Sequence, residues 1–268
     1  MKKIKWFLKV LKEFIIPDRY LTNTQPKHNK IMSFNIRRDN LKDGIYNWQY
    51  RKRPIIEMFS DIKPSVICLQ ECMPHMWKFL KRNTRFSYDG YFTDVITKSV
   101  SLIPFSEGLG ILYSKSYDCL KKGYIKLSNE FGFDTKYWRI CQYVKLHCKK
   151  TGKTFWVLNT HLDHLDKNAR IKGCEVIHSF IQQNCKEESV IICGDFNDDT
   201  FNENSTLKLL ADNYAFVHYS KGTYHGFGKT KRCIDFIFTN ENLYDMSVID
   251  SDYGIKYLSD HYPIIIEL

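Results

Sequence analysis

Short apolar stretches that end in carboxylate, amide or imidazole side chains recur along this chain, and they restrict its fold more than any other feature. The clearest is residues 190–197, V-I-I-C-G-D-F-N, whose four apolar residues predict a strand buried on both faces. Placing Asp195 and Asn197 at the end of a buried strand is costly unless something there needs oxygen ligands. A divalent cation and a phosphate group are the candidates.

The same pattern is repeated at other predicted strands. One polar residue after a strand is usually turn chemistry, but independent turns would rarely produce so many. The strands are predicted at residues 31–34, 66–69, 110–113, 140–146, 155–158, 190–193, 234–238 and 264–268. The polar side chains at or near their ends are Asn35, Glu71, His161, Asp195, Asn197, Asp235, Asp260 and His261. We therefore expect one site at which these groups meet.

Three further residues are candidates for substrate binding. Arg139 begins the strand at 140–146 and could hold a phosphate with two hydrogen bonds. An arginine before a strand is as often a solvated strand end, so both interpretations stay open. His164 closes the segment N-T-H-L-D-H, and His225 lies in G-T-Y-H-G-F.

The predicted helices are fewer than the strands. They lie near residues 54–59, 75–82, 168–184 and 207–210. Strict alternation of strand and helix therefore fails, and two stacked, mainly antiparallel sheets with flanking helices fit better. The 268 residues are within the size of a single α/β domain, which we place at residues 31–268 after an N-terminal segment at 1–30.

Residues 1–17, M-K-K-I-K-W-F-L-K-V-L-K-E-F-I-I-P, predict a basic amphipathic helix. It could pack on its own domain, lie on an anionic membrane surface or be a cleaved signal, and a polar linker would follow it up to residue 30. Lys9 and Lys12 interrupt the apolar run and no small-residue cleavage site follows, which argues against a signal. No stretch is long and apolar enough to span a bilayer.

The net charge of +10 does not indicate a nucleic-acid-binding surface on the domain. The first 53 residues contain 14 Lys and Arg against 4 Asp and Glu, so the remaining residues have no net charge. The nine cysteines are scattered, with no C-x-x-C pair. This distribution predicts a reducing, cytoplasmic environment and makes a zinc site from cysteines improbable.

The ordered segments S-F-N, L-Q-E, N-T-H-L-D-H, G-D-F-N, I-D-F-I-F and S-D-H resemble the endonuclease/exonuclease/phosphatase superfamily. The resemblance covers residues 31–268 and is strongest to an uncharacterised, mostly bacterial branch. It implies a DNase I-like, four-layered α/β sandwich. It also implies metal-dependent hydrolysis of a phosphoester, by a protein that we expect to be monomeric.

The resemblance implies a role for each strand-end residue. Glu71, with Asn35 and Asp260, would hold Mg²⁺ or Mn²⁺, because these hard cations prefer oxygen ligands. Asp195 and Asn197 would orient the attacking water or a second metal.

The two histidines and Asp235 complete the implied site. His261, oriented by Asp235, would lie against the phosphate, and His161 would donate to a non-bridging oxygen. The general base is either Asp195 or the Asp235–His261 pair, and the sequence does not choose between them.

The chain differs from the motifs of the family at three places, and these differences limit the possible substrate classes. Relatives commonly carry a basic residue directly before I-D-F-I, where this chain has Cys233, with Arg232 one position earlier. The motifs of inositol polyphosphate 5-phosphatases are not matched. The lysine that follows L-Q-E in exonuclease III-like enzymes is replaced by Cys72 and Met73.

We expect a Mg²⁺- or Mn²⁺-dependent phosphodiesterase or phosphatase whose substrate class stays open. A nuclease is one alternative, although residues 54–268, which have no net charge, lack the broad positive surface that such binding uses. A membrane-associated phosphodiesterase acting on phospholipid or sphingomyelin head groups is another, because of residues 1–17. A catalytically silent binding module of the same fold is the alternative from a different class.

Overall fold

The computed structural model describes residues 30–95, 107–127, 138–199, 205–219, 222–243 and 246–267, together with Pro26. The predicted N-terminal helix at residues 1–17 and nearly all of the predicted linker lie outside this part of the chain. Among the helices that are described, none combines the length and the hydropathy needed to cross a bilayer.

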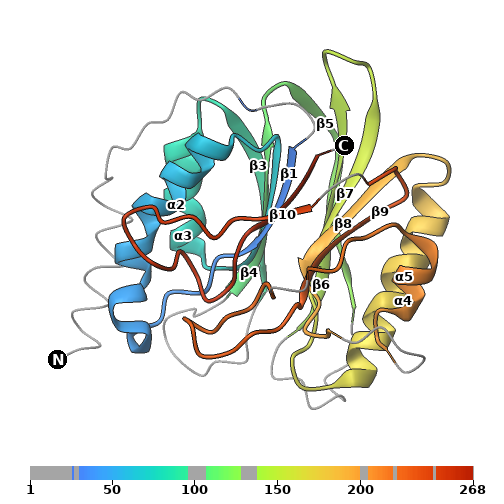
Figure 1. The fold of residues 1–268 in the computed structure, drawn as a ribbon. Coiled ribbons are helices and arrows are strands. Elements are labelled where there is room, and N and C mark those ends of the chain that lie inside the picture. The colour runs from blue at the N-terminus through green and yellow to red at the C-terminus, as the bar shows by residue number, and fades with distance from the viewer. Residues whose placement is uncertain are drawn as a thin grey trace.

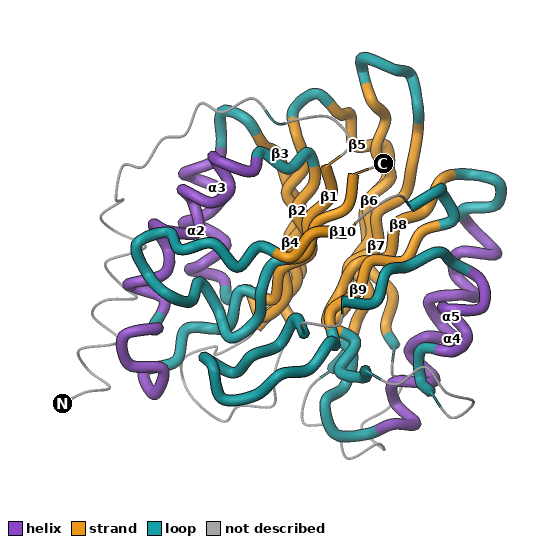
Figure 2. Tube along the Cα trace, in the orientation of Figure 1, coloured by secondary structure: helices purple, strands orange, loops and turns teal. Residues whose placement is uncertain are grey.

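Two β-sheets pack face to face between two layers of helices (Figures 1 and 2). The first sheet has the spatial order β10 (Met246–Val248), β11 (Ile264–Glu267), β1 (Lys30–Asn35), β2 (Val66–Cys72), β4 (Glu107–Ser114) and β3 (Tyr88–Val95). The second has the order β5 (Tyr117–Lys126), β6 (Ile140–Cys148), β7 (Thr154–His161), β8 (Ser189–Asp195) and β9 (Asp235–Thr239).

Figure 2 shows the helices on the outer faces of the two sheets. The first sheet is covered by α2 (Trp48–Ile62) and α3 (Pro74–Thr84), and the second by α4 (Lys167–Asn184) and α5 (Lys208–Asn213). A short 3₁₀ helix, η1 (Leu41–Tyr46), precedes α2. The predicted four-layered α/β sandwich is therefore confirmed.

Two parallel strand pairs place the polar strand ends at one edge of the sandwich. β1 runs parallel to β2, with Asn35 beside Gln70. β7 runs parallel to β8, with His161 beside Asp195. The other pairings described are antiparallel, so β9 begins at this edge, with Asp235 beside Asp195.

Three groups of buried apolar residues hold the layers together. One lies between the sheets, where Val66, Val157 and Ile191 pack. The second lies under α2 and α3, and the third lies under α4 and α5. Because burial on both faces needs apolar residues at every position, the central strands have continuous rather than alternating apolar runs.

The structure corrects one predicted element and adds three strands and the short helix η1. The helix predicted to begin near Pro54 begins at Trp48, because the Asn47 side chain accepts a hydrogen bond from the Gln49 amide and caps it. Pro54 lies inside this helix, where its missing N–H removes only one intrahelical hydrogen bond. β3, β5 and β10 have weaker apolar patterns and were not predicted.

Candidate active site

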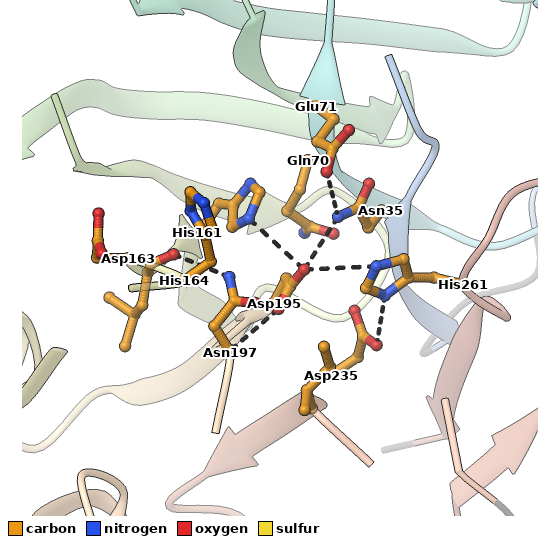
Figure 3. A network of polar contacts seen from close by, with 12 residues as sticks. Asn35, Gln70, Glu71, His161, Asp163, His164, Asp195, Asn197, Asp235 and His261 are labelled. Atoms are coloured by element: carbon orange, nitrogen blue, oxygen red, sulfur yellow. Dashed lines mark hydrogen bonds and ion pairs between the residues drawn. The ribbon is translucent and has the colours of Figure 1, made fainter. Parts of the chain in front are cut away.

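Asp195 is the centre of the polar network drawn in Figure 3. It ends β8 and is only 2% exposed. Its Oδ2 atom accepts a hydrogen bond from Asn35 Nδ2 at 3.0 Å. His161 Nε2 and His261 Nε2 lie 3.5 Å and 3.6 Å from the same oxygen. Three groups from three separate segments therefore converge on one carboxylate oxygen.

His261 lies between two buried carboxylates. Its Nδ1 atom is 2.8 Å from Asp235 Oδ2, while its Nε2 atom faces Asp195 (Figure 3). Burial alone would lower the pKa of His261, but the charges of Asp235 and Asp195 raise it to about 10. Burial and the charge of Asp235 raise the pKa of Asp195 to about 7. At neutral pH His261 is therefore a cation, beside a carboxyl group poised to exchange a proton.

His161 and Asn197 complete the contacts of Asp195. The Asn197 backbone N–H donates to Asp195 Oδ1 at 3.0 Å, and its side chain donates to the Leu162 carbonyl at 3.0 Å. Burial and the positive charge of Arg139 hold the pKa of His161 well below its usual range. His161 is therefore a neutral imidazole at pH 7, with one N–H to donate.

Glu71 occupies a β-bulge in β2, between Leu69 and Cys72, and has a φ of 54°. The bulge turns its carboxylate toward the end of β1. There Oε1 accepts from Asn35 Nδ2 at 3.2 Å and Oε2 accepts from the Arg38 backbone N–H at 3.1 Å. Burial would raise the pKa of Glu71, but the nearby charge of Arg37 brings it to about 2.

The oxygen donors around Arg37 fit a divalent cation. Arg37 Nη1 lies 3.3 Å from Asp260 Oδ2 and 3.9 Å from Glu71 Oε2. Two carboxylates are thus already gathered around one positive charge, with the Asn35 amide beside them. Carboxylate and amide oxygens at one edge of a cleft are the donors that Mg²⁺ and Mn²⁺ prefer. Glu71, Asp260 and Asn35 could therefore hold such an ion.

A second group of donor atoms lies nearby. One donor atom from each of Asp195, Asp235 and His261 lies within 4.8 Å of the others. The hydrogen bond from His261 to Asp235 accounts for part of this closeness. The closeness of these three residues is therefore not by itself evidence of a cation site.

A cleft of about 350 Å³ opens over this network. Of the predicted site residues, those that line it are Glu71, Arg139, His161, His164, Asp195, Asn197, Asp260 and His261. Asn35 and Asp235 are buried and contact the lining residues through the hydrogen bonds described above. His225 is outside the lining; its ring packs 4.2 Å from that of Tyr262 and 4.5 Å from that of Tyr257, measured between centroids.

Six other residues line the cleft and were not among the predicted site residues: Arg37, Arg38, Glu107, Tyr224, Arg232 and Ile234. Arg37 and Arg38 directly follow Asn35, so their position after a strand end was a usable signal. Glu107 begins β4, and an acidic residue at the start of an apolar strand would have been found by the reasoning applied to strand ends. Tyr224, whose ring centroid is 4.8 Å from that of His261, belongs to a loop without a sequence signal of this kind.

Comparison with known proteins gives one family. The model of the family described as "Endonuclease/Exonuclease/phosphatase family" matches residues 32–261. The chain is also 26% identical over 266 residues to the uncharacterised protein L388 of Acanthamoeba polyphaga mimivirus. That match covers 83% of this chain and 92% of the viral protein.

Solved structures share the fold. The endonuclease/exonuclease/phosphatase from Bacteroides vulgatus is 25% identical, with a TM-score of 0.77 over 89% of this chain and 97% of that one. The mannosyl-6-phosphatase of Bacteroides thetaiotaomicron is 24% identical, with a TM-score of 0.73 over 89% and 98%. TDP2 from D. rerio, complexed with a single-stranded DNA product, is 20% identical, with a TM-score of 0.68 over 88% and 97%.

Proposed function

The chain belongs to the endonuclease/exonuclease/phosphatase family, and from that premise we propose that it hydrolyses phosphoester bonds with the help of a bound Mg²⁺ or Mn²⁺ ion. The observation that carries the proposal is the convergence of Asn35, His161 and His261 on one oxygen of Asp195 at the floor of the cleft. A mannosyl-6-phosphatase and a protein complexed with a single-stranded DNA product have the same fold, so the family supports the reaction but not one substrate.

In this proposal Glu71, Asp260 and Asn35 hold the ion. When bound, the ion neutralises phosphate charge and orients the phosphoester. Arg37, already placed between Glu71 and Asp260, adds a fixed positive charge beside the phosphate. These residues bind and orient the substrate and do not transfer protons.

Proton transfer belongs to the Asp195 side of the cleft. A pKa of about 7 suits Asp195 to accept a proton from the attacking water at neutral pH. Asn197 fixes the Asp195 carboxylate through its backbone N–H. His261, held as a cation by Asp235, donates to a phosphate oxygen as charge develops, and neutral His161 donates to a second oxygen. Among the alternatives left open by the sequence, this favours Asp195 as the base.

The test uses the purified full chain with Mg²⁺ or Mn²⁺ and two generic substrates, p-nitrophenyl phosphate and bis-p-nitrophenyl phosphate. We expect metal-dependent turnover of at least one of them, which a chelator abolishes. We expect His261→Ala to lower kcat by roughly 10²- to 10⁴-fold, because a proton donor in the transition state is lost. Circular dichroism and thermal melting of the variant control for folding.

Turnover that survives both chelation and His261→Ala would contradict the proposal. Absence of turnover together with failure to bind Mn²⁺ in a titration would favour the alternative of a catalytically silent binding module. The predicted monomeric state, cytoplasmic location and membrane contact through residues 1–17 stay predictions, as does action on phospholipid or sphingomyelin head groups. The described residues test none of these four.

A further inference from the structure

One end of the cleft carries both signs of charge. Its lining there consists of Arg38, Glu107, Arg139 and His164, which we call the Glu107 wall. Arg38 Nη1 lies 3.9 Å from Glu107 Oε2, and Arg139 Nη2 lies 3.4 Å from His164 Nδ1. Two guanidinium groups, one carboxylate and one imidazole therefore share this wall, unlike the purely cationic surface that favours a polyanion.

The Glu107 wall is held in place from both sheets. Gln142, fully buried on β6, donates from Nε2 to the Leu109 carbonyl at 3.3 Å and to Thr93 Oγ1 at 3.0 Å. Leu109 lies two residues after Glu107, and Gln142 lies three residues after Arg139. The bond from Gln142 to Leu109 therefore fixes the spacing of the two opposite charges across the gap between the sheets, as recognition of a defined ligand requires.

The charge of Glu107 decides which leaving groups fit. The Glu107 carboxylate repels a phosphate placed against it and cancels part of the positive charge of the two guanidinium groups. A second phosphate of a nucleic acid or a bisphosphate would therefore be held less well there than on a purely cationic surface. The carboxylate oxygens of Glu107 accept hydrogen bonds, and the guanidinium groups beside them donate, which matches the hydroxyl groups of a ligand.

A small slot adjoins this end of the cleft and adds an apolar surface. It has a volume of about 20 Å³ and is lined by Trp138, Val95, Leu109 and Ile140 as well as by Glu107. The Trp138 residue is 40% exposed. The slot has room for one small group of a ligand, and the main cleft of about 350 Å³ is the size of a small-molecule site.

We propose that the Glu107 wall is the subsite for an uncharged, hydroxylated leaving group, so that the substrate is the phosphate monoester of a sugar or polyol. Glu107 and Arg139 bind hydroxyl groups, and Trp138 packs on the apolar face of the ring. Glu107 also excludes substrates that carry a second phosphate at this position. This inference rests on the proposed hydrolase function and specifies the substrate class of the same site.

The experiment measures kcat/KM with Mn²⁺ for three substrates: a hexose 6-phosphate, a hexose bisphosphate and p-nitrophenyl phosphate, whose leaving group has no hydroxyl groups to bind. Wild-type protein should prefer the hexose 6-phosphate to the bisphosphate by roughly tenfold or more. Glu107→Ala should lower kcat/KM for the hexose 6-phosphate by roughly 10- to 100-fold, the loss expected for a hydrogen bond to a charged group. Its kcat/KM for p-nitrophenyl phosphate should change by less than about threefold.

Two further variants complete the test. Glu107→Gln keeps the size and hydrogen-bonding capacity of the side chain without the charge, so it should retain hexose 6-phosphate hydrolysis better than Glu107→Ala while accepting the bisphosphate more readily. Asp118→Asn is the matched control. It removes one carboxylate at the other end of β5 and β6, where Asp118 pairs with His147, and it should not change the kcat/KM of the hexose 6-phosphate relative to either of the other two substrates.

The outcomes separate the two proposals. If p-nitrophenyl phosphate is hydrolysed but Glu107→Ala lowers kcat/KM equally for all three substrates, the proposed subsite is contradicted and the hydrolase proposal stands. A wild-type preference for the bisphosphate, or for a dinucleotide added as a fourth substrate, also overturns the subsite. Absence of hydrolysis of every substrate overturns the hydrolase proposal, and the subsite with it.

Discussion

The two ends of the cleft are built differently. At the reaction end, His261 lies 2.8 Å from Asp235, and Asn35 and Asn197 each donate to Asp195 at 3.0 Å. The contacts of His161 and His261 with Asp195, at 3.5 Å and 3.6 Å, join groups that are largely buried. At the Glu107 wall, Arg139 lies 3.4 Å from His164, and the Arg38 side chain is 43% exposed and forms a looser ion pair with Glu107 at 3.9 Å.

This difference suits the reaction end to catalysis and the Glu107 wall to substrate recognition. Short hydrogen bonds among buried groups fix the proton-transfer geometry whatever the substrate, because such networks allow little adjustment. Looser ion pairs can exchange partners with a ligand at less cost. We therefore expect substitutions at the reaction end to affect all substrates equally, and substitutions in the Glu107 wall to affect them selectively.

The largest expected effect tests the first half of this comparison. Asp195→Asn removes the carboxylate on which Asn35, His161 and His261 converge. Because the amide cannot accept a proton from water, kcat should fall by roughly 10³-fold or more for every substrate. Steady-state kinetics on p-nitrophenyl phosphate and a hexose 6-phosphate would measure it.

The control for Asp195→Asn is the ratio of the two substrates. It should match the wild-type ratio even though both rates fall. A ratio that changes by tenfold or more would show that Asp195 also discriminates between leaving groups, and the division of the cleft into two functions would fail.

Much of the fold and of the reaction end was predictable because both follow from strand ends. Continuous apolar runs indicated the central strands, and the polar residue after each run indicated the edge at which Asn35, Glu71, His161 and Asp195 meet. The parallel pairing of β1 with β2 and of β7 with β8 was not predicted. Each pair is joined through a helix, as parallel strands require a crossover connection. The ordered motifs supplied the family.

The Glu107 wall was less predictable because its composition depends on tertiary structure. Arg139 and His164 were found as candidates. Arg38 and Glu107 lie at strand ends and could have been found in the same way, but no local pattern shows that these residues from separate segments pair with each other. The β-bulge that turns the Glu71 side chain requires a positive φ at this glutamate, and no sequence pattern predicts such a φ. Contacts between side chains that are far apart in the sequence therefore cannot be predicted from motif spacing.

An intermediate effect is expected from Thr223, which supports the reaction end from behind. Its fully buried Oγ1 atom accepts hydrogen bonds from the backbone N–H groups of Ile234 and Asp235, both at 3.1 Å. Thr223→Val keeps the shape but leaves both N–H groups without this acceptor, at about 1–3 kcal/mol. Because Asp235 orients His261, we expect kcat to fall by roughly tenfold with little change in KM.

Thr223→Ser is the matched variant, because it restores the oxygen and loses only a methyl group. It should recover most of the lost kcat. If both variants lower kcat equally, or if KM rises instead, Thr223 acts through packing or substrate contact, and the hydrogen bonds to the 234–235 backbone do not sustain the reaction end.

The smallest effect is expected for His225, which lies outside the lining of the cleft but near enough to His261 to be affected by its charge. Burial, with a further contribution from the charge of His261, lowers the pKa of His225 to about 4. An unfolded histidine has a pKa of about 6.5, so between these values the unfolded chain binds a proton that the folded chain does not. This contribution to stability is complete above about pH 6.5 and is lost as the pH falls toward 4.

His225→Phe should keep the ring packed against Tyr257 and Tyr262 while removing the titration. Thermal or urea unfolding at pH 7 and pH 5 should therefore show a smaller loss of stability for the variant than for wild type, by on the order of 1 kcal/mol after allowance for solvent screening. An equal loss in both proteins would contradict the assignment. The second measurement is KM at pH 7. A higher KM for the variant would support the sequence prediction that His225 binds substrate. The substrate-binding surface would then include a residue that does not line the cleft.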